Sequence, residues 1–258
     1  MNMELTFLGT GTSQGIPIIG CDCGVCRSDD PRDKRMRTSV LVGWNGRQVL
    51  IDATPELRLQ CLQNDVRRID AVLITHTHAD HIFGLDDVRR FNQLQNSPID
   101  LYAAPQHLKI LDKIFGYASA QRGDGNRDIP RLVFHAIDGG FDLYDLEVLP
   151  LLLPHGREEV LGFRMGPLAY CTDVSHMPAA AIDQLQGLEI LVLGALRPRP
   201  HPKHLSIDQA IAVAQTIGAG QTYFVHMSHQ VGHQEQEQAL PENIHLAYDG
   251  LKLTCNGA

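Results

Sequence analysis

Four side chains able to bind a metal ion lie within six residues of one another, well inside the chain. Residues 75–81 read THTHADH and directly follow the apolar run 71–74. A loop that ends a buried strand can direct all of these side chains towards one point, and imidazoles beside a carboxylate suit zinc, iron, nickel or manganese. Histidine clusters in tails and purification tags are solvated, but this one lies between two apolar segments. The sequence therefore predicts a metal site formed by His76, His78, Asp80 and His81.

The spacing H-x-H-x-D-H is the signature of the metallo-β-lactamase superfamily, which the chain resembles over nearly its whole length. In that family the remaining ligands are a distant histidine, an aspartate and a last histidine, each at the end of its own strand. Three residues stand in this order after apolar runs: His155, Asp173 and His226.

The resemblance implies two catalytic divalent ions, manganese or zinc, with one shared carboxylate. The expected ligands are His76, His78 and His155 for one ion, Asp80, His81 and His226 for the other, and Asp173 for both. Such a pair lowers the pKa of a bridging water, so hydroxide is available at neutral pH. Redox members of the flavodiiron type carry glutamate in the place of His78, so we expect hydrolysis, with Asp80 among the catalytic residues.

A general acid is expected from the proline-rich segment 197–206, which follows the strand-like run 189–193. The segment is similar to the phosphodiesterase branch of the superfamily, where a histidine just before an apolar residue and a helix protonates or binds the leaving group. His204 is the matching position. An unperturbed imidazole titrates near pH ~6.5, which suits proton donation. His201 has no such match and is expected to be an ordinary loop residue.

Three of the six cysteines, Cys21, Cys23 and Cys26, form a C-x-C-x-x-C cluster in a glycine-rich segment. Three thiolates can hold zinc, which needs a fourth ligand in a structural site. Disulfides are the alternative. Gly9 interrupts the only apolar run near the N-terminus, so we expect no secretory segment. We therefore expect the protein in the reducing cytoplasm, where disulfides are disfavoured. In the phosphodiesterase branch exemplified by the phosphonate-pathway enzyme of the carbon–phosphorus lyase operon, a histidine three residues beyond the last catalytic histidine completes such a zinc site, which implies His229.

Secondary-structure signals alternate along the whole chain. Strands are expected at 5–8, 39–42, 48–51, 71–74, 132–134, 146–153, 168–171 and 189–193, with a hairpin turn at 44–47. Helices are expected at 55–63, 86–94 and 206–217, the last opening with Ser206 as N-cap. The polar run 234–238 is expected to be a surface turn. This recurrence fits the α/β class, with two mixed sheets packed face to face and helices outside as in the αββα sandwich of the family, and one domain spanning residues 1–258.

The net charge of −8 argues against a long polyanionic substrate, so a tRNA-processing nuclease is disfavoured. A hydrophobic fraction of 43% supports a sizeable core. No segment approaches the ~18 consecutive apolar residues of a membrane span, so the protein is expected to be soluble.

The resemblance implies a metal-dependent phosphodiesterase acting on a small, cyclic phosphodiester such as a phosphorylated ribose 1,2-cyclic phosphate. Thioester or lactone hydrolysis on the same dinuclear core is an alternative. The two differ in their need for His204, because an alkoxide leaving group needs a proton and a thiolate does not. A non-catalytic binding protein is a third alternative, which the intact ligand set disfavours. The sequence leaves open the native substrate, the oligomeric state, a homodimer included, and the role of segment 116–130.

Overall fold

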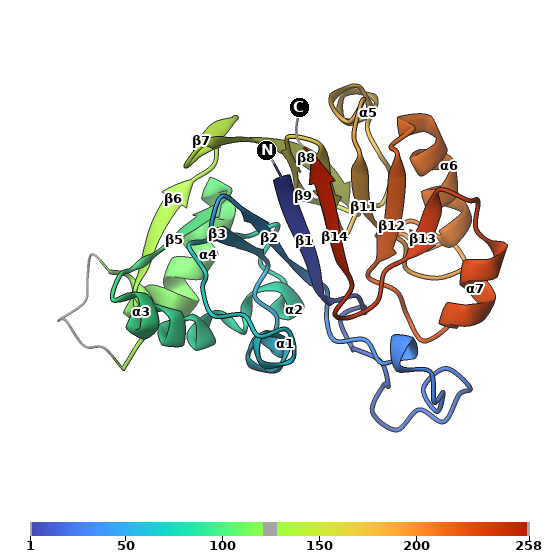
Figure 1. Cartoon of the computed structure of the whole chain (residues 1–258), viewed down its shortest axis with the longest axis horizontal. Helices are drawn as coiled ribbons and strands as arrows, with labels where there is room; N and C mark the ends of the chain where they lie inside the picture. The colour runs from blue at the N-terminus through green and yellow to red at the C-terminus, as the bar shows by residue number, and fades with distance from the viewer. Residues whose placement is uncertain (1, 121–127, 257–258) are drawn as a thin grey trace.

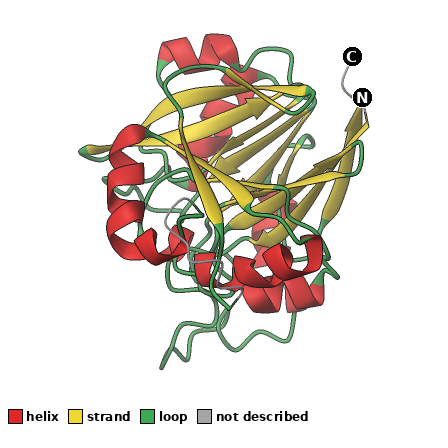
Figure 2. Ribbon diagram, turned by 90° about the vertical axis from the view of Figure 1, so that its left-hand side faces the viewer, coloured by secondary structure: helices red, strands yellow, loops and turns green. Residues whose placement is uncertain are grey.

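The structure is a computed structural model that describes residues 2–120 and 128–256. It contains two seven-stranded mixed sheets that pack face to face, with helices on both outer faces (Figures 1 and 2). The predicted αββα sandwich is therefore confirmed. Of the segment 116–130, residues 121–127 lie outside the described residues.

The first sheet has the order β14-β1-β2-β3-β4-β5-β6. Its strands are β1 (Asn2–Gly9), β2 (Ser39–Trp44), β3 (Arg47–Ile51), β4 (Ala71–Leu73), β5 (Ile99–Ala103), β6 (Leu132–Ala136) and β14 (Lys252–Asn256). The four strands from β14 to β3 are antiparallel, and those from β3 to β6 are parallel. Asn45 and Gly46, both at positive φ, form the predicted two-residue turn between β2 and β3.

The second sheet has the order β13-β12-β11-β10-β9-β8-β7. Its strands are β7 (Phe141–Leu143), β8 (Leu146–His155), β9 (Glu158–Met165), β10 (Leu168–Cys171), β11 (Ile190–Gly194), β12 (Gln221–Val225) and β13 (Ile244–Leu246). It repeats the pattern of the first sheet, antiparallel from β7 to β10 and parallel from β10 to β13.

Seven α-helices cover the described parts of the two sheets: α1 (Leu57–Gln63), α2 (Ala79–Ile82), α3 (Arg89–Gln95), α4 (Pro105–Phe115), α5 (Ala179–Gln184), α6 (Ile207–Ile217) and α7 (His233–Ala239). Side chains of α1 to α4 pack on the first sheet, and those of α5 and α6 pack on the second. A third apolar cluster fills the space between the sheets, with Phe7 and Phe163 at its centre. Within residues 2–120 and 128–256, no helix is both long and apolar enough to span a bilayer.

Two local predictions had different outcomes. Ser206 caps α6 as predicted, because its hydroxyl accepts a hydrogen bond from the backbone of Gln209, whose side chain bonds back to Ser206. The prediction of a surface turn at 234–238 is wrong, because these residues belong to α7. Glutamine and glutamate are good helix formers, and buried His233 at the start of α7 anchors the helix to the core.

Candidate metal centre

All seven residues predicted to bind the catalytic metals lie at one edge of the sandwich, where the sheets meet. The motif at 76–81 follows β4, His155 ends β8, Asp173 follows β10, and His226 follows β12. Backbone hydrogen bonds join the sheets there, from Leu161 N–H to Thr75 O at 2.9 Å and from Thr12 N–H to Met227 O at 2.9 Å. The edges of both sheets therefore supply one site.

Two groups of side chains converge at this edge. Within each group, one ligand atom per residue lies within 4.8 Å of every other; the groups are His76, His78, His155 and Asp173, and Asp80, His81 and His226. Nε2 of His76 lies 2.9 Å from Nδ1 of His78. Nε2 of His81 lies 3.3 Å from Oδ2 of Asp80. The two groups contain the residues that the resemblance assigns to each ion, and their role as ligands stays a prediction.

Asp173 lies between the two groups. Its Oδ2 is 3.3 Å from Nε2 of His76 and 3.3 Å from Nε2 of His81, while its Oδ1 is 3.1 Å from Nε2 of His226. The carboxylate is almost fully buried. It is the residue in position to serve both groups.

The donor set fits divalent metal ions. Nε2 of His81 and Nε2 of His226 are buried and form no hydrogen bond of normal geometry. Buried polar atoms without a partner are costly unless they coordinate something, and imidazole beside carboxylate is a common ligand set for zinc and manganese. A pair of dications would satisfy these atoms.

The charges of the site also suit cations. Burial raises the pKa of Asp173, but the imidazoles of His226 and His81 outweigh it and hold that pKa well below its ordinary value. Burial lowers the pKa of His81, yet the carboxylates of Asp52 and Asp173 raise it well above its ordinary value. The pKa of His76 falls to about 4 because of burial and the neighbouring His81. The carboxylates are therefore ionised and face imidazole nitrogens.

Asp52 is a functional residue that the sequence interpretation missed. Its buried carboxylate accepts hydrogen bonds from Nδ1 of His81 at 2.7 Å and from the backbone and hydroxyl of Thr75 at 2.9 and 2.8 Å. The Thr75 hydroxyl lies 2.9 Å from Nδ1 of His76. These contacts leave Nε2 of both histidines facing the site, as outer partners of metal ligands do. The available signal was its position directly after the apolar end of β3.

Two further contacts orient histidines of the first group. Nδ1 of His155 donates a hydrogen bond of 2.9 Å to the carbonyl oxygen of Lys203. Nε2 of His78 lies 3.1 Å from Oε2 of Glu158, whose other oxygen is 3.6 Å from the Lys203 ammonium. The loop before α6 and the β8–β9 turn therefore support this group together.

Backbone conformation helps to direct the ligands inward. Asp52, Asp173 and His226 have φ values of 62, 53 and 59°, in the left-handed region that residues other than glycine rarely adopt. Each stands just beyond the end of a strand. Strained backbone of this kind clusters at functional sites.

His204 lies beside Asp173, with Nδ1 3.8 Å from Oδ1 of the carboxylate and 14% of its side chain exposed. Its ring stacks on His226, with centroids 4.9 Å apart, and meets His155 edge-on at 4.8 Å. Burial and the neighbouring His226 lower its pKa to about 3, so the imidazole is neutral at pH 7. The ring of His201 lies 5.1 Å from that of His204, so this loop residue is its direct neighbour.

His107, in α4, contacts the loop that carries the predicted ligands of the 76–81 motif. It is mostly buried, and its Nδ1 lies 3.1 Å from the hydroxyl of Thr77, between two predicted ligands. Its position in the sequence gives no sign of this contact.

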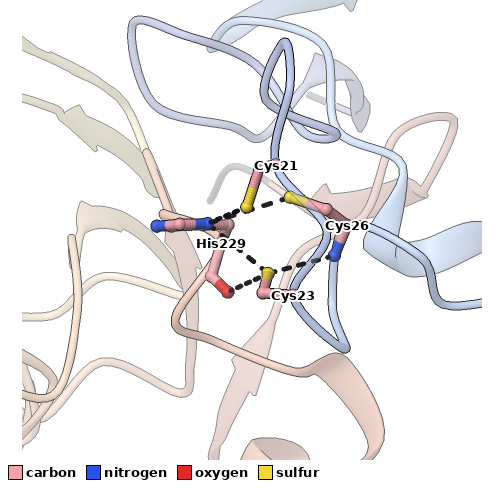
Figure 3. A group of neighbouring side chains, drawn as sticks. All are labelled: Cys21, Cys23, Cys26 and His229. Carbon is pink, nitrogen blue, oxygen red and sulfur yellow. Dashed lines mark hydrogen bonds between the residues drawn. The ribbon is translucent and has the colours of Figure 1, made fainter.

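The cysteine cluster and His229 form a separate site (Figure 3). Nδ1 of His229 lies 3.2, 3.5 and 3.8 Å from the sulfur atoms of Cys21, Cys23 and Cys26. A hydrogen bond from the Cys26 backbone N–H is the main cause that lowers the pKa of Cys23 to about 6, whereas burial raises that of Cys26 to about 11. All six cysteines are free. Three sulfurs and one imidazole nitrogen fit the tetrahedral ligand set of structural zinc.

Arg35 connects the N-terminal loop region to the segment after β12, which carries the predicted metal-binding histidines His226 and His229. Its buried guanidinium pairs with Asp33 at 2.9 Å and donates to the carbonyl oxygen of Val231 at 2.8 Å. His226 and His229 stand only three residues apart in this segment. The cysteine site and the larger centre therefore take one predicted ligand each from the same short segment.

Comparisons with known proteins agree with this architecture. Residues 47–227 match the family described as the beta-lactamase superfamily domain. A crystal structure of a new diphosphatase from the PhnP family is 42% identical, with a TM-score of 0.92, and the alignment covers 99% of this chain and 98% of that one.

Two curated relatives add to the comparison. An octanoyltransferase of Porphyromonas gingivalis is 38% identical over 253 residues, or 97% of this chain, but only 51% of the relative. The chain thus spans about half the length of that protein. A ribonuclease Z of Pyrobaculum islandicum is 23% identical over 280 residues, covering 94% of this chain and 92% of the relative.

Proposed function

The chain belongs to the beta-lactamase superfamily, and from that premise we propose that it is a metal-dependent phosphodiesterase that hydrolyses a small, cyclic phosphodiester. The similarity to a PhnP-family diphosphatase over almost the full length of both chains supports phosphoester chemistry. The observation that carries the proposal is the position of His204. Its half-buried ring stacks on the predicted ligand His226, so it is close enough to the proposed ions to serve as the proton donor that a leaving group needs.

We assign His76, His78, His155 and Asp173 to one catalytic ion, and Asp80, His81, His226 and Asp173 to the other. When bound there, manganese or zinc ions supply hydroxide at neutral pH and neutralise charge on the phosphate. Asp52 fixes the tautomer of His81. Asp173 lies between the two groups of ligands, within reach of both.

His204 protonates the departing alkoxide in this account. Its lowered pKa keeps it neutral in the substrate-free protein. A bound phosphodiester places a negative charge beside the ring, and a nearby opposite charge favours the imidazolium form. Substrate binding should therefore raise the pKa of His204 towards the range in which the ring can deliver a proton.

We assign a structural zinc ion to Cys21, Cys23, Cys26 and His229, separate from the catalytic pair. The ligand set and its convergence support this assignment. Unpaired thiols also support a cytoplasmic location, because disulfides form in oxidising compartments.

A small substrate fits the net charge better than RNA does. The charge of −8 repels a polyanion on average, although one relative is a ribonuclease Z. Acyl hydrolysis is the second candidate, because another relative is an octanoyltransferase. The chain matches only half of that protein, so this candidate has less support.

A substrate panel tests the proposal. Metal-stripped protein receives Mn²⁺, Zn²⁺ or Ni²⁺ and is assayed on cyclic phosphodiesters, linear bis-aryl phosphodiesters, thioesters and lactones. We expect metal-dependent turnover with kcat/KM highest for a cyclic phosphodiester. Higher kcat/KM for a thioester or a lactone would favour the second candidate, and no turnover of any class would favour a binding protein.

A further inference from the structure

A cavity lies away from the predicted metal centre, between α1 and α3 on the outer face of the first sheet. Its volume is about 480 Å³. Buried Leu57, Cys61 and Phe91 line it, together with the more exposed Leu62 and Leu94. None of the predicted metal ligands contributes to it.

The lining is suited to an apolar group. Leu62 is 64% exposed and Leu94 is 51% exposed, so both leucines offer surface that a ligand would remove from water. Burial raises the pKa of Cys61 to about 12, so its thiol stays neutral. The volume lies within the ~300–1,000 Å³ typical of small-molecule pockets, which are mostly apolar with a few polar groups.

The charged residues around the cavity are mainly cationic. They comprise four arginines and two aspartates: Arg58, Arg67, Arg89, Arg90, Asp65 and Asp87. The formal charge of this set is +2, in a chain whose total is −8. The rim therefore favours an anion against the average field of the protein.

Two of the four arginines form ion pairs with aspartates, and the other two are available to a ligand. Arg67 pairs with Asp65 at 2.5 Å, and Arg89 pairs with Asp86 at 2.5 Å. Arg58 and Arg90 are exposed and form no ion pair with a carboxylate in the described part of the chain. Arg90 donates a hydrogen bond to the neutral side chain of Gln93.

We propose that this cavity binds an amphiphilic anion, a carboxylate or a phosphate carried on an apolar chain. The chain would lie against Leu57, Cys61 and Phe91 between the two exposed leucines. The anionic head would lie at the rim, where the guanidinium groups of Arg58 and Arg90 bind carboxylate or phosphate through paired N–H donors. This site is independent of the proposed phosphodiesterase activity.

Ligands that share a tail but differ in charge test the proposal. Titration calorimetry on the metal-loaded, full-length protein would compare octanoate, octyl phosphate, octanol and octylammonium, with butyrate as the short-chain control. We expect octanoate or octyl phosphate to bind more tightly than octanol, and octylammonium least. Each buried methylene should tighten binding about fourfold, so butyrate should bind on the order of 10²-fold more weakly than octanoate. Equal affinities for octanoate and octylammonium would overturn the proposal.

Variants locate the binding. Arg58→Gln combined with Arg90→Gln should weaken octanoate binding roughly five- to thirtyfold, since exposed ion pairs contribute modestly. Lys109→Gln combined with Lys252→Gln removes the same charge from exposed positions that do not line the cavity, and should leave binding unchanged. Unchanged binding in the arginine variant would place the anion elsewhere, including at the catalytic metals, and overturn the proposal.

Leu62→Asp tests the apolar wall, with Leu152→Asp as a control at a similarly exposed leucine on β8. Only Leu62→Asp should abolish octanoate binding. Light scattering on the same proteins tests another occupant. If the parent binds no octanoate and Leu62→Asp converts a dimer to a monomer, the cavity is an interface between two copies of the chain, and the proposal is wrong.

Discussion

The carboxylate of Asp52 accepts a hydrogen bond of 2.7 Å from Nδ1 of His81. Because Nδ1 is held by Asp52, Nε2 faces Asp80 and Asp173 and is the nitrogen left for a metal ion. The same carboxylate holds Thr75, whose hydroxyl contacts His76. One buried residue therefore fixes a histidine in each group of predicted ligands.

Asp52→Ala should weaken metal binding about 10- to 100-fold, as loss of an outer partner does at other metal sites. Competition with a zinc chelator measures this affinity without relying on turnover. Asp142→Ala, at the exposed position of β7, is the control. An unchanged affinity in Asp52→Ala would show that His81 needs no such support.

Cys23→Ser and His229→Ala should each lose one zinc ion per chain and lower the melting temperature. Thiolate ligation contributes directly to folding stability, so the change should be large. Metal analysis and thermal unfolding measure both effects, and Cys255→Ser, at an isolated buried cysteine, should keep its full metal content. If the first two variants also keep it and melt like the parent, the cluster is not a zinc site.

His204→Ala should slow hydrolysis of substrates with poor leaving groups by roughly 10²- to 10⁴-fold, the usual contribution of general acid–base catalysis. The nitrophenolate group of a nitrophenyl phosphodiester departs without a proton, so hydrolysis of that substrate should keep its rate. His201→Ala, in the same loop, should not discriminate between the two substrates. Equal losses on both substrates in His204→Ala would remove it from the acid role, and a raised KM alone would make it a binding residue.

Asp249 should make stability depend on pH. Burial raises the pKa of its carboxyl group to about 7, against hydrogen bonds from the Met36 backbone and the Thr10 hydroxyl. A raised pKa means that the folded state holds the proton more tightly than the unfolded chain. The stabilisation is therefore complete below pH ~4 and is lost as the pH rises through about 7.

Between pH 5.5 and 7.5 this loss should amount to about 2 kcal/mol of unfolding free energy, which Asp249→Asn should abolish. Denaturant unfolding of the parent and the variant at both pH values measures the difference. If the unfolding free energy changes equally with pH in the parent and in Asp249→Asn, Asp249 is ionised at both pH values.

Much of the fold follows from local sequence patterns. The apolar runs before residues 76, 173 and 226 are the strands β4, β10 and β12. The ligands after β10 and β12 meet because the parallel strands of one sheet end at the same edge, and those after β4 approach from the facing sheet. The turn at Asn45 and Gly46 and the cap at Ser206 depend only on near neighbours. Such features are encoded locally, so the sequence predicts them well.

Other features depend on tertiary packing. An aspartate after a strand is common in turns, and Asp52 acquires its role only when β3 and β4 pair and bring it to Thr75 and His81. The polar run at 234–238 is partly exposed as predicted, but its backbone is helical. An exposed helix face and an exposed turn have the same composition, so composition alone does not separate them. The contact of His107 with the metal-binding loop likewise requires that α4 pack beside it.

Turnover of a cyclic phosphodiester by metal-loaded Asp80→Ala is the most direct test of the proposed dinuclear mechanism. His78→Ala examines the other ion, and Asp86→Ala, a half-buried aspartate outside the predicted ligand sets, is the control. We predict that Asp80→Ala and His78→Ala lose at least about 10³-fold in kcat while keeping their fold, because hydroxide activation needs both ions. Near-parental turnover by Asp80→Ala, in protein whose metal content and folding have been verified, would contradict the account.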